Sequence, residues 1–347
     1  MRRVCFFILF GILSTTFNYG IQLEKIDCWK HDQTYWGPIS GSFLDFSGDL
    51  VLKFNKGPVV FNKNESVPFA LFGQGPDEIT QLFTICEYRE DLALFEDINK
   101  VKVFKKTGST YTWKQTIWLK RDPLPLFLKA ALFYKGHLFL AGWNVQGIPT
   151  SPDTMNVANL QIFEENSKSP GKNIILETGV KADRQYEIDR FLIPYGDHVL
   201  YLKQSEMKII FVSLKTLDVE KSIDLSIPRF YKPMPKDFYM RKDYKGNHKD
   251  YLIDLENWST SYSAITKAVL YKNDYLILQI RTCSEQQGKF ALLLYNLKNS
   301  CSLDGVYFIN DLLLAERDGK LYCYKNGNPD LDEDAETTEI NIYGINE

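Results

Sequence analysis

The sequence predicts an all-β fold, namely a six-bladed β-propeller of four-stranded antiparallel blades. Two observations predict it. A short apolar run, a tight polar turn and a second apolar run recur six times along the 347 residues, and helical periodicity of any length is hard to find. Such a motif is typical of a β-hairpin, and four-stranded units that recur about six times are typical of a propeller.

The hairpins follow one another along the whole chain. Their central strands are continuous apolar runs, as expected when a sheet is buried on both faces between neighbouring blades. The hairpins are expected at residues 43–52, 82–95, 130–140, 191–202, 268–280 and 306–314. Third strands are expected at residues 59–61, 101–104, 160–163, 209–212, 290–295 and 321–324, and fourth strands at 68–72, 113–119, 173–176 and 222–225.

The repeat is uneven between the fourth and fifth hairpins. An inserted loop is therefore expected at about residues 227–261, which are rich in Pro, Lys, Asp and Tyr and lack strand alternation. A seventh, degenerate blade in this stretch is the alternative, because blade number varies among propellers. Residues 330–347 form an acidic C-terminal segment, and its first part is interpreted as a solvated tail. Either residues 22–27 or residues 338–343 must complete the last blade.

The N-terminus has the pattern of an export signal. Arg2 and Arg3 precede an apolar run at residues 4–13, which is too short to span a bilayer. We expect a signal peptide at residues 1–20, with cleavage near Gly20, followed by one propeller domain at residues 21–347. An uncleaved anchor or a buried N-terminal strand is the alternative. The mature protein is then extracytoplasmic, periplasmic or secreted, with no stable membrane anchor.

Charge and cysteine content exclude several function classes. The formal net charge is −3, so no basic field predicts nucleic-acid binding. Cysteines occur at irregular spacing without a CxxC motif, which argues against zinc and thioredoxin-type sites. Cys86 and Cys323 lie in strand-like runs and are expected to be small buried hydrophobic residues. One or two disulfides are possible after export, but spacing alone does not assign them.

A glycine-rich linker at residues 73–78 joins the first two units. Gly73 and Gly75 allow backbone angles that other residues avoid, and Pro76 fixes the next turn. Glu78 is expected to accept hydrogen bonds from backbone N–H groups of the linker. The segment lacks the Lys-Ser/Thr pair and the following helix of a phosphate-binding loop, so a structural role is favoured.

This linker, together with the polar turn that enters the strand at residues 101–104, resembles bacterial six-bladed β-propeller families related to NHL repeats, including TolB-like proteins. In those families a G-x-G-P-x-E linker precedes a strand. The resemblance covers about 35 residues; the remaining units agree in pattern only. It implies the fold and an exported protein, and it implies little about activity.

The longest connections are where binding is expected, because long loops on a rigid scaffold usually carry function. The insertion at residues 227–261 and a second loop at residues 141–156 are expected on the same face of the ring. A self-packed loop that covers a blade edge is the alternative. Aromatic and arginine side chains are typical of contact surfaces. The candidate ligand-binding residues are Trp143, Arg229, Phe230, Tyr231, Tyr239, Arg241 and Trp258.

Two functions follow from these observations. The first is a binding or scaffolding propeller for a peptide, a glycan or a partner protein. The second is a hydrolase or lyase that uses a divalent cation in the axial channel, for which Asp45, Glu87 and Asp189 are the nearest candidates. The first is favoured, and no cofactor or metal site is predicted, because His31, His137, His198 and His248 are scattered without partners at ligand spacing.

Overall fold

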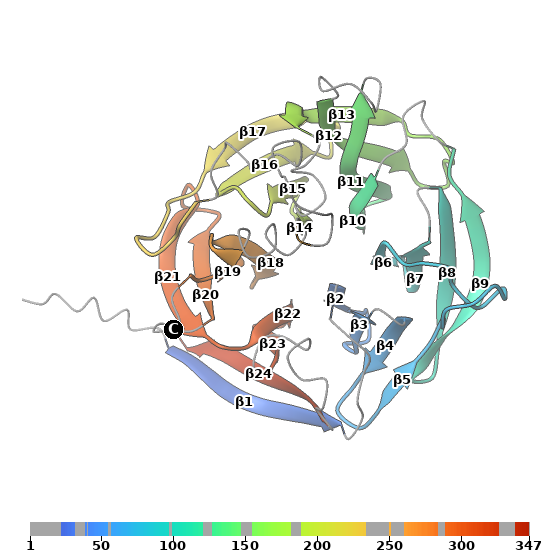
Figure 1. Ribbon diagram of the computed structural model, residues 1–347, viewed down its shortest axis with the longest axis horizontal. Coiled ribbons are helices and arrows are strands. Elements are labelled where there is room, and N and C mark those ends of the chain that lie inside the picture. Colours follow the sequence, from blue (N-terminus) through green and yellow to red (C-terminus); the bar gives the residue numbers. More distant parts are fainter. Residues whose placement is uncertain are drawn as a thin grey trace, which may run out of the picture.

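The computed structural model describes residues 22–31, 39, 41–54, 57–96, 99–120, 127–146, 155–181, 189–233, 250, 260–283, 289–325 and 337–346. These residues form six four-stranded antiparallel sheets arranged in a ring (Figure 1). The predicted six-bladed β-propeller is therefore confirmed. No seventh sheet occurs in this part of the chain.

The first strand of each blade lies nearest the axis of the ring, and the later strands follow outward (Figure 1). Blade one contains β2 (Gly41–Leu44), β3 (Leu50–Phe54), β4 (Gly57–Phe61) and β5 (Ser66–Pro68). Blade two contains β6 (Thr84–Tyr88), β7 (Asp91–Phe95), β8 (Lys100–Thr107) and β9 (Thr110–Trp118). Blade three contains β10 (Phe127–Tyr134), β11 (His137–Gln146), β12 (Met155–Glu164) and β13 (Lys172–Lys181).

The second half of the ring repeats this order until the last blade. Blade four contains β14 (Arg190–Tyr195), β15 (His198–Lys203), β16 (Lys208–Ser213) and β17 (Val219–Asp224). Blade five contains β18 (Ala264–Tyr271), β19 (Tyr275–Arg281), β20 (Phe290–Asn296) and β21 (Ser302–Ile309). Blade six contains β22 (Leu312–Arg317), β23 (Lys320–Tyr324), β24 (Thr338–Asn346) and β1 (Gln22–His31).

Both ends of the described chain close the ring. β24 is the third strand of blade six, and β1 pairs with it as the outermost strand, from Gln22 opposite Asn346 to His31 opposite Thr338. The two segments proposed from sequence as alternatives are thus both used. The pairing fastens the N-terminal strand, which precedes blade one in the chain, to the last blade through backbone hydrogen bonds, so its release would expose an unpaired strand edge on β24.

The prediction of the sixth hairpin at residues 306–314 is wrong. Residues 306–309 lie in β21, the outer strand of blade five, and residues 321–324 form a second strand rather than a third. The turn-like Asn310 and Asp311 connect two blades, and Asp311 is buried, accepting hydrogen bonds from Asn341 Nδ2 at 2.6 Å and Tyr343 OH at 2.7 Å. The hairpin turn itself is at Asp318 and Gly319, whose φ angles of 52° and 74° suit a type I′ turn.

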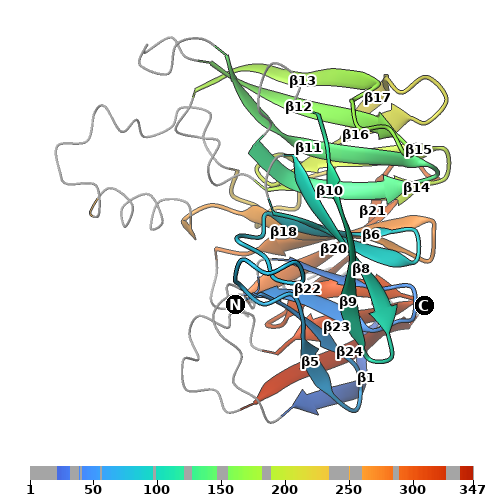
Figure 2. The same cartoon turned by 90° about the vertical axis from the view of Figure 1, so that its right-hand side faces the viewer.

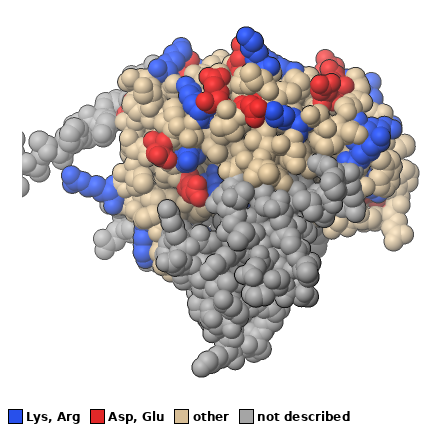
Figure 3. Space-filling view, turned by 90° about the horizontal axis from the view of Figure 1, so that it is seen from above, with Lys and Arg blue, Asp and Glu red and all other residues tan. Residues whose placement is uncertain are grey.

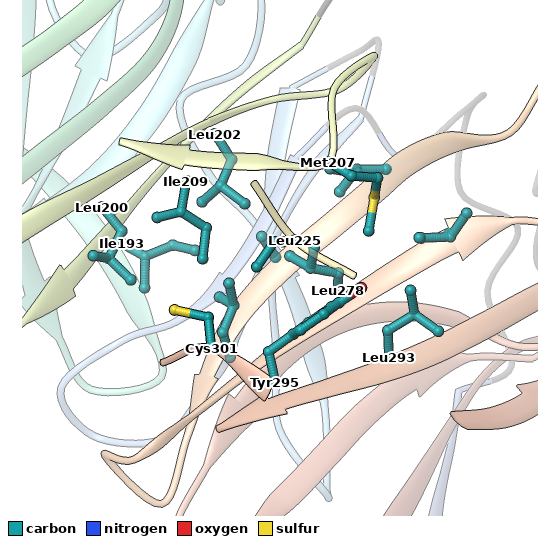
Figure 4. Close-up of a cluster of buried hydrophobic side chains, with 14 of the residues drawn as sticks. Ile193, Leu200, Leu202, Met207, Ile209, Leu225, Leu278, Leu293, Tyr295 and Cys301 are labelled. Carbon is teal, nitrogen blue, oxygen red and sulfur yellow. The ribbon is translucent and has the colours of Figure 1, made fainter. Parts of the chain in front are cut away.

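The hydrophobic core lies in the seams between neighbouring blades. Between blades four and five, Leu200, Leu202 and Ile209 pack with Leu278 and Tyr295 (Figure 4). All five side chains are 0% exposed. Burial of one such aliphatic side chain contributes about 1.5–3 kcal/mol, so the seams are the main source of stability. The central strands are apolar because each of their two faces meets a different seam.

The linker at residues 73–78 is tied to blade two. Gly75 N donates to Glu78 Oε2 at 2.7 Å, and a Cβ at Gly73 would collide with the same carboxylate. Lys102 Nζ donates to the backbone oxygens of Gly75, at 3.1 Å, and of Glu78. Lys102 is 4% exposed, and its ion pair with Glu96 at 3.6 Å keeps the buried charge compensated.

The described cysteines are all free thiols: Cys28, Cys86, Cys283, Cys301 and Cys323. Cys86 and Cys323 are buried in strands, as predicted. Burial raises the pKa of Cys86 to about 12, so this thiol stays protonated and behaves as a small apolar side chain. No helix in the described residues has the length and apolar character needed to cross a membrane.

Candidate functional site

The two faces of the ring carry different connections, because successive strands of a blade run antiparallel. Turns that join first to second strands, and third to fourth strands, lie on one face, here called the hairpin-turn face. Second and fourth strands end on the opposite face, here called the long-loop face, where the connections to third strands and to the next blade start (Figure 2). The connection from blade four to blade five, at residues 225–263, starts on the long-loop face.

The predicted loop at residues 141–156 is shorter than expected. β11 continues to Gln146 and β12 begins at Met155, so only residues 147–154 connect them. The extended strand pairing at both ends of this stretch explains the difference. Longer connections run over residues 69–83 and 325–337; the first lies on the long-loop face, and β23 and β24, which flank the second, meet it at that face.

The predicted ligand-binding residues do not form one surface in the described part. Arg229 is exposed, and Phe230 is half-buried with its ring 5.2 Å from that of Phe308. Tyr231 is 7% exposed and packs in the seam between blades four and five, which leaves it little surface for a ligand. The backbone of Trp143 lies in β11, opposite Phe127 and Ala158. The remaining candidates, Tyr239, Arg241 and Trp258, lie outside the described residues.

Lysine side chains reach across the channel near its long-loop mouth. Lys53, at the end of β3 in blade one, donates to Phe83 O of blade two at 2.7 Å. Burial lowers the pKa of Lys53 to about 8, the charge of Asp189 opposes this shift, and the charge of Lys129 adds to it. Lys129 belongs to blade three and Asp189 precedes blade four, so groups from different blades act on the charge of Lys53.

Lys267 crosses the channel from blade five. Its Nζ donates to Ser42 O at 2.6 Å and Ser42 Oγ at 3.0 Å, in blade one, and Ser42 Oγ donates to Leu314 O in blade six at 2.6 Å. No ion pair joins Lys267 to a described residue, and burial lowers its pKa to about 8. The amine is thus held by neutral oxygens, which stabilise a charge less well than a carboxylate does.

We predict that Lys267 makes stability depend on pH. The folded-state pKa is about 8 and the ordinary value is 10.5, so between these values the unfolded chain binds more protons. The free energy of unfolding therefore rises with pH in this window. Urea unfolding midpoints measured from about pH 7 to about pH 9.5 test this. The rise should shrink in Lys267→Met and persist in the surface variant Lys298→Met, and equal slopes in all three proteins would contradict it.

The hairpin-turn mouth of the channel has a cavity of about 600 Å³, lined by Tyr134, Tyr195, His198, Leu270 and Asn273 among others. Two of its polar side chains have partners within the protein. Tyr134 OH donates to Gly196 O at 2.9 Å, and His198 Nε2 lies 2.9 Å from Glu220 Oε2. The two mouths therefore differ, because the buried amine of Lys267 has neutral partners only.

The carboxylates considered for metal catalysis do not converge. Asp189 precedes β14 at the long-loop face, whereas Asp45 and Glu87 lie toward the hairpin-turn face. Burial raises the pKa of Glu87, Asp45 raises it further, and Arg317 opposes the shift. Within the described residues, no three His, Cys, Asp or Glu side chains are placed to share a metal ion.

Asp45 is fully enclosed. Its carboxylate accepts hydrogen bonds from Ser47 Oγ at 2.7 Å, Lys106 Nζ at 2.5 Å and Tyr111 OH at 2.5 Å. Burial by itself raises the pKa of Asp45, but the hydrogen bonds from Lys106, Tyr111 and Ser47 outweigh it, and the pKa lies below its usual value. Since Lys106 and Tyr111 belong to blade two, the group joins two blades and its role is structural.

Comparison with known proteins supports the fold alone. No protein-family model matches the chain, and no curated protein matches its sequence. A solved structure from Bacteroides vulgatus, a member of the DUF4221 family, is similar with a TM-score of 0.58 at 12% identity, covering 94% of this chain and 98% of that one. A luciferin-regenerating enzyme gives a TM-score of 0.53 at 10% identity, covering 94% and 95%. A candidate exported protein from Bacteroides fragilis gives 0.51 at 13% identity, also covering 94% and 95%.

These neighbours are six-bladed propellers in arrangement, and they do not decide between NHL-related families and others. The resemblance of residues 73–78 to the NHL-related linker stays a prediction.

The sequence interpretation missed the lysines of the channel. Lys129 and Lys267 stand within mostly apolar first strands, each followed by an alanine, and each strand has a register shift beside its lysine. A lysine within an expected first strand could have indicated a channel residue, since the first strands of a propeller border the channel.

Proposed function

We propose that this chain is an exported binding or scaffolding propeller that holds a peptide, a glycan or a partner protein on its long-loop face. The basic and apolar pattern of residues 2–13 supports export. Cleavage near Gly20 would leave the closing strand whole, because β1 begins at Gln22. The described exterior carries interspersed basic and acidic side chains in the view of Figure 3, which fits a soluble scaffold rather than a nucleic-acid surface.

The observation that carries the proposal is the amine of Lys267, which reaches Ser42 of blade one and has only neutral partners, with Lys53 and Lys129 on two further blades of the same ring. A buried amine held by neutral oxygens alone, such as that of Lys267, is costly, and a ligand with acidic groups would compensate its charge. The same face carries exposed Arg229, followed in the chain by half-buried Phe230, and arginine and aromatic residues are common at interfaces. An acidic peptide or a glycan with uronic or sulfated sugars therefore fits this mouth best.

Arrays of acidic and neutral peptides and glycans test the proposal with the mature protein. We expect acidic probes to bind, and Lys53→Met and Arg229→Ala to weaken this binding by roughly tenfold each, as lost charge-assisted contacts do. Lys135→Gln, on the hairpin-turn face, is the matched control and should bind as the wild type does. Binding that only Lys135→Gln abolishes, or no binding to any acidic probe, would overturn the proposal.

A further inference from the structure

A second cavity, of about 210 Å³, lies in the seam between blades two and three. Its apolar walls include Phe95, Val101, Phe133, Leu138 and Phe163, which belong to the buried cluster of this seam or pack against it. The turns at its mouth, between β6 and β7 and between β12 and β13, lie on the hairpin-turn face. The cavity is thus separate from the long-loop mouth of the channel.

The cavity arises from small side chains at positions where blades three, four and five have large ones. In blade two the third residue of the second strand is Ala93, and its cross-strand partner is Val103. Both are 1% exposed, so the missing volume lies inside the seam. The equivalent pairs in blades three, four and five are Phe139 with Ile162, Leu200 with Phe211, and Ile277 with Leu294. The seam therefore has a gap beside Ala93, because close packing needs side-chain volume there.

An arginine stands at the mouth of this cavity. Arg89 forms an ion pair with Glu165 of blade three and donates to Asn166 Oδ1 at 3.2 Å. Its guanidinium lies 5.6 Å from the ring centroid of Tyr88. The side chains of Arg89 and Glu165 are 49% and 40% exposed, and such exposed pairs contribute little to stability. A carboxylate on a ligand could therefore replace Glu165 as the partner of Arg89 at little cost.

We propose that this cavity binds a small monocarboxylate, whose apolar body fills the space beside Ala93 and whose carboxylate pairs with Arg89. An apolar cavity of about 150 Å³ is known to hold benzene, so this one has room for a single aromatic ring or a short alkyl chain. The planar guanidinium fork of Arg89 is suited to a carboxylate. This site is independent of the function proposed above, since none of the channel lysines nor Arg229 lines it.

Calorimetric titration of the mature protein with 3-phenylpropionate and with 3-phenylpropanol tests the proposal. The two probes share the ring and the chain, and they differ in the charged group. We expect the acid to bind roughly tenfold more tightly than the alcohol, the lower end of what a charge-assisted hydrogen bond supplies. Arg89→Gln should lower the affinity for the acid to that for the alcohol.

Two further variants separate the cavity from the charge at its mouth. Ala93→Leu introduces the side chain that blade four has at this position, and it should abolish binding of both probes without lowering the melting temperature. Val103→Phe provides the same filling from the neighbouring strand if Ala93→Leu does not fold. Lys135→Gln removes the equivalent turn cation of blade three and should leave binding unchanged. Unchanged binding in a folded cavity-filling variant, or equal affinity for acid and alcohol, would overturn the proposal.

Discussion

Asp45→Ala is expected to lower the free energy of unfolding by about 3–5 kcal/mol, the cost of removing one partner from a buried charged group. The carboxylate is 0% exposed and bonds both Lys106 and Tyr111 of blade two. Without it, the Tyr111 hydroxyl loses its acceptor inside the seam, and Lys106 keeps only Asp49 as a charged partner. Urea unfolding monitored by tryptophan fluorescence measures the loss.

The matched control is Asp197→Ala. Asp197 also pairs with a lysine of another blade, Lys135, at 2.6 Å, but its side chain is 83% exposed. An exposed pair contributes about 0–1 kcal/mol, so this variant should unfold almost as the wild type does. Similar small losses in both variants would show that Asp45 does not join blades one and two in the way that its hydrogen bonds suggest.

Trp29→Ala should also lower the free energy of unfolding by about 3–5 kcal/mol, as replacement of other buried aromatic side chains by alanine does. Trp29 lies in β1, is 8% exposed, and contacts Tyr322 edge-on with ring centroids 5.3 Å apart. It packs with Leu50, Leu52 and Phe61 of blade one, so it holds the closing strand against the first blade. Loss of this contact weakens ring closure as well as the seam.

Trp118→Ala provides the comparison, because Trp118 also lies in the outer strand of a blade but is 54% exposed. Its loss should cost less than about 1 kcal/mol, as surface substitutions usually do. Thermal and urea unfolding of both variants give the two values. If Trp29→Ala is no more harmful than Trp118→Ala, closure of the ring does not depend on packing of β1 against blade one.

The first five hairpins could be predicted from sequence, because a hairpin is specified by neighbouring residues. Lys135 and Gly136 both have positive φ, as a tight turn between two apolar strands requires. The same kind of turn residue led to the wrong sixth hairpin at Asn310 and Asp311, since polar turn residues occur both between strands of one blade and between blades. Only the pairing of β22 with β23 showed that blade six begins after Asp311.

The candidate site was less accessible to sequence analysis. The face that carries the long insertion follows from strand order, which local patterns reveal. The residues of the channel do not follow from local patterns, because they meet only after the ring closes. Lys267 bonds Ser42 across 225 residues of sequence, and the Ala93 cavity exists only because the packing of blade three leaves the volume unfilled.

The sequence by itself determined that this protein is a ring of six antiparallel units, since alternation, turn chemistry and apolar central strands act within a few residues. The tertiary structure alone decided how the ring closes, which lysines face the channel and where the seam is hollow. Each of these depends on surfaces brought together from distant parts of the chain, where burial and charge are set by the neighbouring blade rather than by neighbouring residues.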